Sequence, residues 1–510
     1  GVGLLATDVR IDKKGRLAEL PSETMARLNS VLPRTWSHNN PVDIIGDAPP
    51  GRYIDALKAL LEDKGVDAIV VLNCPTAVAS STEAARAVVD TLKESGSKAD
   101  SRGLFTSWLG MDSAREARQL FAENRIPTYE TPAEAVRGFM QIVRYRRSQE
   151  TLMETPPNIP EVFEPETEKA RGIVGKALSE GRVWLTETEA KAVLAAYKIP
   201  AVRTYEAATT EQAAEIAARL GEPVALKILS PDITHKSDVG GVALDLASEE
   251  SVQKTAQGML ERIRKILPEA RISGFTVQPM IQRPNAHELI IGISDDVQFG
   301  PVILFGQGGT AVEIIGDKAI ALPPLNMHLA REVMTNTRVY RLLEGYRGRP
   351  AADLDSIALT LVKVSQLVSD IGDIAELDIN PLLADEQGVL ALDARIKVVK
   401  SDLPATQRLA IRPYPKELEE ILTLPDGQTL LLRPIRPEDE PALQALFSRL
   451  SMEEIRLRFL HPMKVLPHNL AARLTQIDYD RAVSYTHLRA HETNDLISDS
   501  VFGWETGGGG

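Results

Sequence analysis

Residues 225–242, ALKILSPDITHKSDVGGV, place a lysine inside an apolar strand pattern and follow it with a polar loop that ends in two glycines. The expected strand, 222–228, puts its alternate apolar residues on one face and Lys227 on the other. A lysine among apolar neighbours is costly unless its ammonium group meets an anion or reaches water. Gly240 and Gly241 permit the close backbone approach that a phosphate cradle needs.

The loop itself has two interpretations. Residues 241–247, GVALDLA, predict the next strand, so the polar stretch connects two strands. It is then either a solvated hairpin loop, which such residues commonly form, or a loop that covers an anion. Its spacing alone favours the hairpin loop.

A second signal lies in residues 375–396, AELDINPLLADEQGVLALDARI, which predict two strands joined at 385–388. If that loop has four residues, Asn380 lies directly opposite Asp393, and opposed residues share one face of a hairpin. Two oxygen-bearing side chains in this arrangement suit Mg²⁺, which takes few protein ligands and completes its shell with phosphate and water.

The alternative for this hairpin is a solvated polar face on which Asp378 pairs with Arg395 across the ladder. A shift of one residue in the register would also remove the alignment of Asn380 with Asp393. The hairpin alone therefore leaves a metal site and an ion-paired face both open.

The composition is that of a globular enzyme. The chain has 510 residues, 58 Lys+Arg against 71 Asp+Glu, and a net charge of −13, which argues against general affinity for nucleic acid. No apolar stretch is long enough to span a bilayer. The one cysteine, Cys74, indicates a reducing compartment, and its place at the end of an apolar run predicts a small buried side chain. We expect a cytoplasmic protein without membrane or nucleic-acid partners.

Changes in pattern divide the chain into six segments. Strands that alternate with helices predict a parallel, flavodoxin-like sheet at the start of the chain, and stretches rich in proline and acidic residues indicate linkers. The last segment has no helical or strand period and is expected to be a non-native, adapter-derived tail. The six segments are the flavodoxin-like domain 1–147, a linker 148–183, a mixed domain 184–400, a linker 401–427, a strand–turn–helix segment 428–483 and the tail 484–510.

The order of these motifs resembles the ATP-grasp fold: a strand lysine, a glycine loop, a polar hinge and an Asn/Asp hairpin. Six sequence stretches resemble the nucleotide-binding part of ADP-forming acyl-CoA synthetases, the family of the succinyl-CoA synthetases. They are ALKILSPDITHKSDVGGV, VQPMI, ELIIG, FGQGGTAVE, ELDINPLL and ALDARI. NNPVDIIGDAP and CPTAVAS are similar to the CoA-ligase domain of that family. LLLRPIRPEDEPALQALFSRLS resembles the start of a GNAT acetyltransferase domain, and this domain order is that of the Pat-type protein-lysine acetyltransferases.

The resemblance implies roles in nucleotide binding for several residues. Lys227 would contact the nucleotide phosphates, and the loop at Gly240 and Gly241 would fold over them through backbone N–H groups. Gln278 would lie at the hinge, where neighbouring backbone reads the adenine edge. Glu288 would lie near the ribose or the loop.

The resemblance also implies a metal site and a reactive histidine. Asn380 and Asp393 match the Mg²⁺ ligands of the family. His235 would carry a phosphoryl group between the nucleotide and a second histidine, with Lys236 and Ser237 as donors to the phosphoryl oxygens. The alternative for His235 is a loop histidine that only donates a hydrogen bond to phosphate.

These implications predict an α/β protein with a flavodoxin-like CoA-ligase domain, an α+β ATP-grasp domain and an incomplete GNAT domain, truncated at both ends. The chain is expected to bind Mg·ATP or Mg·ADP. Its parent would be a homo-oligomeric enzyme that uses CoA or acetyl-CoA and acetylates protein lysines. Two alternatives remain: a catalytically silent module that senses nucleotide or acyl-CoA, and a plain ADP-forming acetate–CoA ligase.

Overall fold

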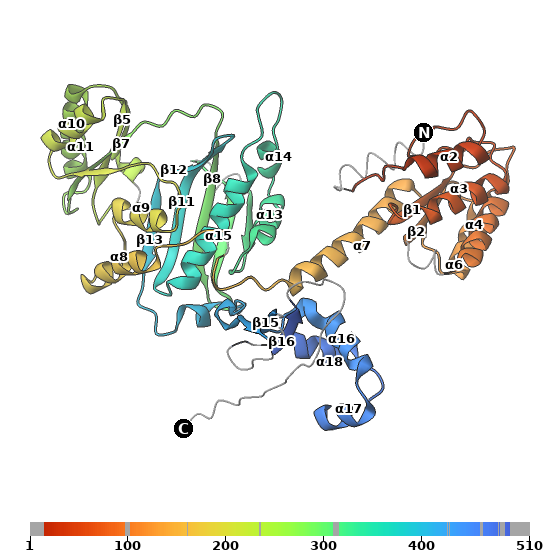
Figure 1. Cartoon of the computed structure of the whole chain (residues 1–510). Helices are drawn as coiled ribbons and strands as arrows, with labels where there is room; N and C mark the ends of the chain where they lie inside the picture. Colours follow the sequence, from red (N-terminus) through yellow and green to blue (C-terminus); the bar gives the residue numbers. More distant parts are fainter. Residues whose placement is uncertain are drawn as a thin grey trace. The chain divides into compact units, whose positions relative to one another are not determined.

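The protein divides into two compact units, Gly1–Leu152 and Met153–Gly510. Figure 1 shows the computed structural model, with the elements labelled along the chain. The structure describes residues 15–96, 103–160, 162–233, 236–309, 316–425, 427, 429–459, 463–477, 479 and 485–489.

Unit 1 is built on a parallel sheet in the order β1-β2-β3. The parallel register runs from Ala68 opposite Gly103 to Asn73 opposite Trp108, as expected for strands that alternate with helices. Trp108 and Phe121 are fully buried and meet edge to face between the sheet and a helix, with ring centroids 4.6 Å apart. The elements are α2 (Ser22–Val31), α3 (Pro50–Glu62), β1 (Ala68–Asn73), α4 (Ser81–Ser95), β2 (Gly103–Trp108), α6 (Arg115–Glu123), β3 (Thr128–Tyr129) and α7 (Pro132–Met153).

Cys74 corrects one expectation. The sequence predicted a buried side chain, but β1 ends at Asn73 and Cys74 is exposed in the loop that follows. The run of residues that predicted a buried strand therefore continues one residue past the end of β1, and this last residue is exposed.

Within the part of the chain that the structure describes, every helix is too short or too polar to cross a bilayer.

Unit 2 contains a four-stranded antiparallel sheet in the order β4-β7-β5-β6. Leu226, Ile228 and Phe275 are buried against α10 and α11, which lie beside this sheet in Figure 1. The alternation predicted for residues 222–228 is therefore observed. The elements are β4 (Tyr205–Ala207), α10 (Thr210–Leu220), β5 (Val224–Leu229), β6 (Val242–Leu246), α11 (Glu249–Ile266) and β7 (Gly274–Pro279).

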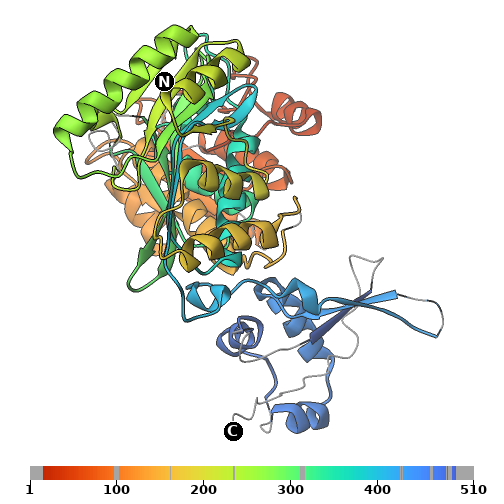
Figure 2. The ribbon, with the colours of Figure 1, turned by 90° about the vertical axis from the view of Figure 1, so that its left-hand side faces the viewer.

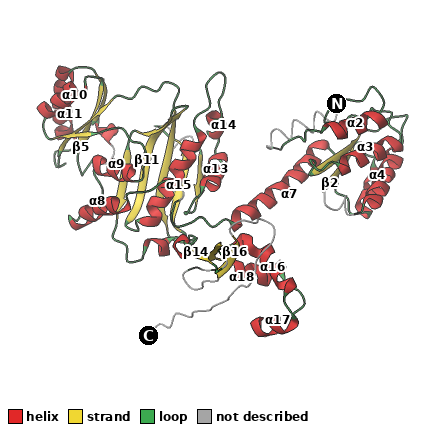
Figure 3. Cartoon of the chain, in the orientation of Figure 1, coloured by secondary structure: helices red, strands yellow, loops and turns green. Residues whose placement is uncertain are grey.

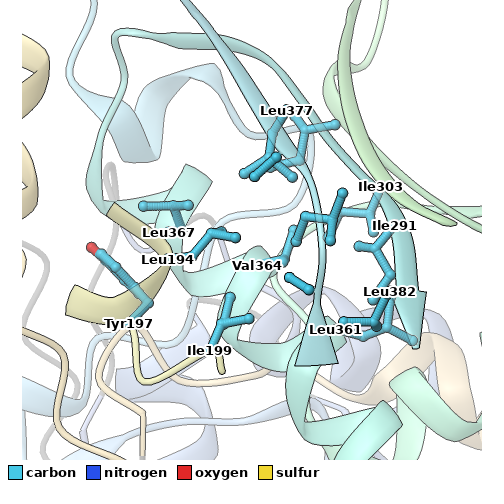
Figure 4. Close-up of a cluster of buried hydrophobic side chains, with 14 of the residues drawn as sticks. Leu194, Tyr197, Ile199, Ile291, Ile303, Leu361, Val364, Leu367, Leu377 and Leu382 are labelled. Atoms are coloured by element: carbon cyan, nitrogen blue, oxygen red, sulfur yellow. The ribbon is translucent and has the colours of Figure 1, made fainter. Parts of the chain in front are cut away.

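A second sheet in unit 2 follows the order β10-β9-β8-β11-β12, with β13 also paired to β11. Strands and helices around it are distinguished by colour in Figure 3. Figure 4 shows the apolar core, where Leu361 and Val364 of α15 lie near Ile291 and Ile303 of the sheet. The elements are α9 (Glu187–Ala196), β8 (His287–Asp296), β9 (Gly300–Gln307), β10 (Lys318–Ala321), α13 (Met327–Thr335), α14 (Tyr340–Leu343), α15 (Leu354–Asp370), β11 (Ile374–Asp385), β12 (Gly388–Ala391) and β13 (Ala394–Val398).

The predicted hairpin at 375–396 has the expected register but a broken second strand. Ala384 pairs with Val389, as predicted, but the chain leaves the ladder between β12 and β13, at Leu392 and Asp393. The break lies beside Pro381, which has no N–H to donate and whose carbonyl accepts a hydrogen bond of 3.0 Å from the Leu392 N–H.

The segments predicted to be linkers contain ordered structure. Residues 148–183 include α8 (Thr167–Ser179), whose Ala170, Val174 and Ala177 are buried in the apolar core of unit 2. In the second segment, 401–427, Tyr414 is fully buried.

The C-terminal segment has the predicted strand, turn and helix in β15 (Thr429–Pro434) and α16 (Glu440–Arg449). β14 (Glu420–Thr423) pairs with β15, and the hairpin is drawn in blue in Figure 2. β16 (Tyr485–Arg489) also pairs with β15, although the sequence predicted no periodic structure beyond residue 484. Two further helices are α17 (Met452–Phe459) and α18 (His468–Thr475).

Replacing Leu361 with alanine tests the core of unit 2. Leu361 is fully buried, so Leu361→Ala removes apolar contacts and leaves a cavity; we expect the free energy of unfolding to fall by about 2–5 kcal/mol. Leu457→Ala is the control, because Leu457 is 68% exposed on α17. Urea unfolding followed by circular dichroism measures both variants, and equal midpoints would contradict the assigned core.

Candidate functional site

Lys227 meets carboxylates from two other parts of unit 2. It lies on β5, is 7% exposed and donates a hydrogen bond of 2.8 Å to Oε1 of Glu187. Its Nζ also lies 3.7 Å from Oδ1 of Asp393. The strand lysine thus has the anionic partners that its burial requires, and it brings the four-stranded sheet close to the loop between β12 and β13.

Glu187 is the residue on which the local charges converge. It begins α9, and the preceding Thr186 forms a capping box with Glu189. Oε1 of Glu187 accepts hydrogen bonds from Lys191 at 2.9 Å and from Lys227 at 2.8 Å. Its Oε2 accepts one of 2.8 Å from Lys236, at the start of the short 3₁₀ helix Lys236–Val239. We call Glu187, Lys191, Lys227 and Lys236 the lysine cluster.

Glu187 was not predicted from the sequence. The available signal was the spacing of Glu187 and Lys191, four residues apart, which is also typical of an ordinary ion pair on a solvent-exposed helix. Only the packing of α9 shows that this pair is buried.

The electrostatics of the lysine cluster follow from its burial. Burial alone would raise the pKa of Glu187, but Lys227, Lys236 and Lys191 outweigh it and hold that pKa far below its usual value. Burial works against the charge of Lys227 too, yet Asp393 and Glu187 raise its pKa above that of a free lysine. For Lys191 the balance is reversed, and burial lowers the pKa more than Glu187 raises it.

Gln278, the predicted hinge residue, joins the cluster through Lys191. It lies on β7 opposite Ala225, is buried, and its Oε1 accepts a hydrogen bond of 3.0 Å from Lys191. The hydroxyl of Thr204 donates to the same oxygen at 3.3 Å. Because two donors face Oε1, the orientation of the Gln278 amide is fixed by its neighbours.

The Gly240–Gly241 loop packs tightly against β5. The N–H of Gly241 donates to the carbonyl of Lys236 at 2.7 Å, and the carbonyl of Gly241 accepts from the N–H of Ile228 at 2.8 Å. A Cβ on Gly241 would lie 2.7 Å from Cγ2 of Ile228, so the close approach requires glycine. His235, the predicted phosphate carrier, lies outside the described residues, as does the side chain of Ser237.

The predicted metal ligands Asn380 and Asp393 are aligned by the register of β11. Ile379 pairs with Ala394 and Leu382 with Ala391, and this common register places Asn380 opposite Asp393. Oδ1 of Asn380 accepts a hydrogen bond of 3.0 Å from the N–H of Gly309.

Asp378 adds a buried carboxylate beside this pair. It faces Arg395 in the ladder, as the alternative interpretation required, but its buried Oδ1 has no hydrogen-bond partner among the described residues. Burial raises the pKa of Asp378, Arg395 lowers it, and Asp393 raises it further. The cross-strand ion pair of this face is instead Glu376 with Lys397, at 2.7 Å.

This donor set fits a divalent cation with few protein ligands. The described residues contain no group of three or more His, Cys, Asp or Glu side chains that could hold a metal ion. An Asn/Asp pair with an unpartnered carboxylate oxygen nearby suits Mg²⁺, because this ion keeps waters and takes phosphate oxygens as further ligands.

Glu288 lies with the glycines that follow β9. Its backbone carbonyl accepts a hydrogen bond of 2.8 Å from the N–H of Gly308, and a Cβ on Gly309 would lie 2.3 Å from its Oε2. The side chain is exposed, and no contact with the lysine cluster is present among the described residues. Gly309 lies against Glu288 and donates its N–H to Asn380. Among the described residues, Glu288 is therefore linked to Asn380 and not to Lys227.

Comparison with known proteins matches two domain families. A Ligase-CoA domain matches residues 1–163, and an ATP-grasp domain matches residues 176–398. The second match contains Glu187, Lys227, Asn380 and Asp393.

Three relatives illustrate the similarity. Acetate–CoA ligase [ADP-forming] I of Archaeoglobus fulgidus is 35% identical over 78% of this chain, which spans 55% of that relative's length. The beta subunit of acetate–CoA ligase [ADP-forming] II of Pyrococcus furiosus is 39% identical over 45% of this chain and 97% of the subunit. A solved acetyl-coenzyme A synthetase 1 of Ca. Korarchaeum cryptofilum, in complex with coenzyme A and Mg-AMPPCP, is 36% identical, with a TM-score of 0.40, and covers 45% of this chain and 100% of that chain.

The chain matches nearly the whole length of the Pyrococcus beta subunit at 39% identity, and its ATP-grasp match, residues 176–398, carries the lysine cluster and the Asn380–Asp393 pair. It therefore belongs to the family of ADP-forming acetate–CoA ligases.

Proposed function

We propose that this chain binds Mg·ATP or Mg·ADP and serves as the nucleotide-binding part of an ADP-forming acyl-CoA ligase. The observation that carries the proposal is that Nζ of Lys227 lies 3.7 Å from Oδ1 of Asp393, beside the glycine loop. A cation for the phosphates and a carboxylate for the metal are thus side by side, each held by a different sheet of unit 2.

The lysine cluster has hydrogen-bond donors to offer phosphate. Lys227 and Lys236 each donate one hydrogen bond within the described structure, to Glu187, and an ammonium group has three N–H donors. Charge-assisted hydrogen bonds from these lysines to phosphate oxygens are strong where water is excluded. Backbone N–H groups near Gly240 would add donors from the covering loop.

Asn380 and Asp393 would hold Mg²⁺, with Asp378 at its edge. The bound ion would neutralise and orient the phosphate oxygens during phosphoryl transfer. Lys227 lies 3.7 Å from Asp393 and serves as its counter-ion. The N–H of Gly309 donates to Oδ1 of Asn380 and orients this side chain.

The reaction class follows from the family. An ADP-forming acyl-CoA ligase converts ATP, a carboxylic acid and CoA into acyl-CoA, ADP and phosphate. Within that scheme we propose His235 as the residue that accepts the phosphoryl group, and unit 1 as the part that works with CoA. The matched Ligase-CoA and ATP-grasp segments support this assignment.

We propose a plain ligase in place of the protein-lysine acetyltransferase that the sequence predicted first. The relatives reported above are named as acetate–CoA ligases or an acetyl-CoA synthetase, and the domain matches end at residue 398, before the segment that resembles GNAT. The proposed partners are therefore nucleotide, CoA and an acyl group. A relative that is itself one subunit of an enzyme supports the expectation of an oligomer.

Replacing Lys227 with alanine tests the proposal. The variant loses the ammonium group that would contact the phosphates, and we expect the affinity for Mg·ADP to fall by at least about tenfold, because one charge-assisted hydrogen bond contributes about 1.5–3 kcal/mol. Isothermal titration calorimetry of the whole chain measures this affinity. Lys265→Ala, an exposed site on α11, is the matched control. A folded wild-type chain without Mg-dependent nucleotide binding would refute the proposed function.

Replacing Asp393 with asparagine tests the metal site. Asp393→Asn keeps the size of the side chain but removes its charge, so nucleotide affinity should depend less steeply on the Mg²⁺ concentration than in the wild type. Titration of ADP binding at several Mg²⁺ concentrations gives this dependence. The control is Asp402→Asn, in the segment after β13 and exposed to solvent. An unchanged Mg²⁺ dependence in Asp393→Asn would place the ion elsewhere.

A further inference from the structure

We infer that Glu187 is a positioning residue of the nucleotide site, whose one buried carboxylate holds the ammonium groups of Lys227 and Lys236 in place for the phosphates. The inference rests on the proposed function, because it assigns a role within that same site. It adds a residue that touches neither nucleotide nor metal and acts through the two lysines.

The geometry joins three separate elements through one side chain. Oε1 of Glu187 lies 2.8 Å from Nζ of Lys227 on β5, and Oε2 lies 2.8 Å from Nζ of Lys236 in the loop after β5. Glu187 itself begins α9, where the positive end of the helix dipole favours a negative charge. Strand, loop and helix are therefore fixed to one another at the point where phosphate would bind.

The order of burial places the carboxylate behind the lysines. The side chain of Glu187 is 2% exposed, that of Lys227 is 9% exposed and that of Lys236 is 15% exposed. An anion that arrives from solvent meets the ammonium groups before it reaches Glu187. The carboxylate thus supports the lysines from the interior and does not block the approach of phosphate.

The hydrogen bonds separate two kinds of lysine. Lys191 donates to Glu187, Thr204 and Gln278, which uses its three N–H donors. Lys227 and Lys236 each donate once to the described residues, and both bonds go to Glu187. Lys191 consequently has a structural role. The N–H donors left for a ligand belong to Lys227 and Lys236, which Glu187 orients.

Removing the charge of Glu187 has two opposing effects on phosphate binding. The loss of a nearby anion would strengthen the attraction of the site for phosphate. However, Lys236 then loses its carboxylate partner among the described residues and Lys227 keeps only Asp393, at 3.7 Å, and a freed lysine side chain recovers rotamer freedom that binding must restrict again. Because Lys227 and Lys236 each donate their hydrogen bond among the described residues to Glu187, which lies behind them, we expect the second effect to dominate.

The central test compares Glu187→Gln with wild type for ligands with and without phosphates. A glutamine has one oxygen instead of two, so it cannot accept from all three lysines. We expect the affinity for Mg·ADP to fall by about tenfold, and that for adenosine to stay unchanged, because adenosine carries no phosphate. Glu187→Asp, which keeps the charge, should recover part of the loss and provides a second variant if Glu187→Gln folds poorly.

A double-mutant cycle then asks whether Glu187 acts through Lys236. If it does, Lys236→Ala weakens Mg·ADP binding, and adding Glu187→Gln to it weakens binding by less than the product of the two single losses. Independent, multiplicative effects would overturn the inference. Unchanged or tighter Mg·ADP binding by Glu187→Gln would also overturn it.

Glu189→Gln provides the matched control on the same turn of α9. Glu189 caps the helix and pairs with Arg182 through two hydrogen bonds of 2.8 Å, but it makes no contact with the lysine cluster among the described residues. Its loss should lower stability and leave the ratio of ADP to adenosine affinity unchanged. If wild-type chain binds no Mg·ADP, the proposed function itself fails; if it binds and Glu187→Gln behaves like Glu189→Gln, only this inference fails.

Discussion

The site that we propose for nucleotide depends on one buried carboxylate that accepts hydrogen bonds from three lysines. Glu187 is almost fully buried, and so are Lys191 and Lys227. Breaking such a buried charge network by removing one partner costs about 3–5 kcal/mol, because the remaining charges lose their compensation. The network therefore constrains the position of α9 against β5 and also fixes where ammonium groups are available to a ligand.

The site also draws on two different sheets of unit 2. Lys227 comes from the four-stranded sheet, whereas Asp393 comes from the break between β12 and β13 at the larger sheet. That break exists beside Pro381, which cannot continue the ladder. The interruption frees the backbone around Asp393 from strand pairing, and its Oδ1 accepts a hydrogen bond of 3.0 Å from the adjacent N–H of Ala394.

The sequence predicted those parts of the site that local pattern controls. Lys227 stands out because a charged residue interrupts an apolar strand, and Asn380 with Asp393 follows from counting register across a hairpin. Glu187 could not be predicted in this way, because its burial depends on α9 packing against strands that are distant in sequence. The capping box of α9 is a signal in the local sequence, but it marks only where the helix begins and does not indicate which face is buried.

The same distinction explains the segments that the sequence treated as linkers. Prolines and acidic residues indicate a break in regular structure, but they do not determine whether the chain packs against a core. Ala170, Val174 and Ala177 of α8 have helical spacing, so a signal for a buried face was present in the first segment. The burial of Tyr414 in the second segment has no comparable periodic signal.

Tyr414 shows how closely that second segment is bound to unit 2. Its backbone N–H and carbonyl are bonded to the chain at Pro156 and Asn158, and Gln366 of α15 donates to the carbonyl of Asn158 at 2.8 Å. The guanidinium carbon of Arg436 lies 4.0 Å from the centroid of the Tyr414 ring, which adds a cation–π contact from the C-terminal segment. A domain boundary at residue 401 would separate Tyr414 from these backbone partners and expose a fully buried aromatic ring. The packed body of unit 2 therefore includes Tyr414, and Arg436 of the C-terminal segment contacts it directly.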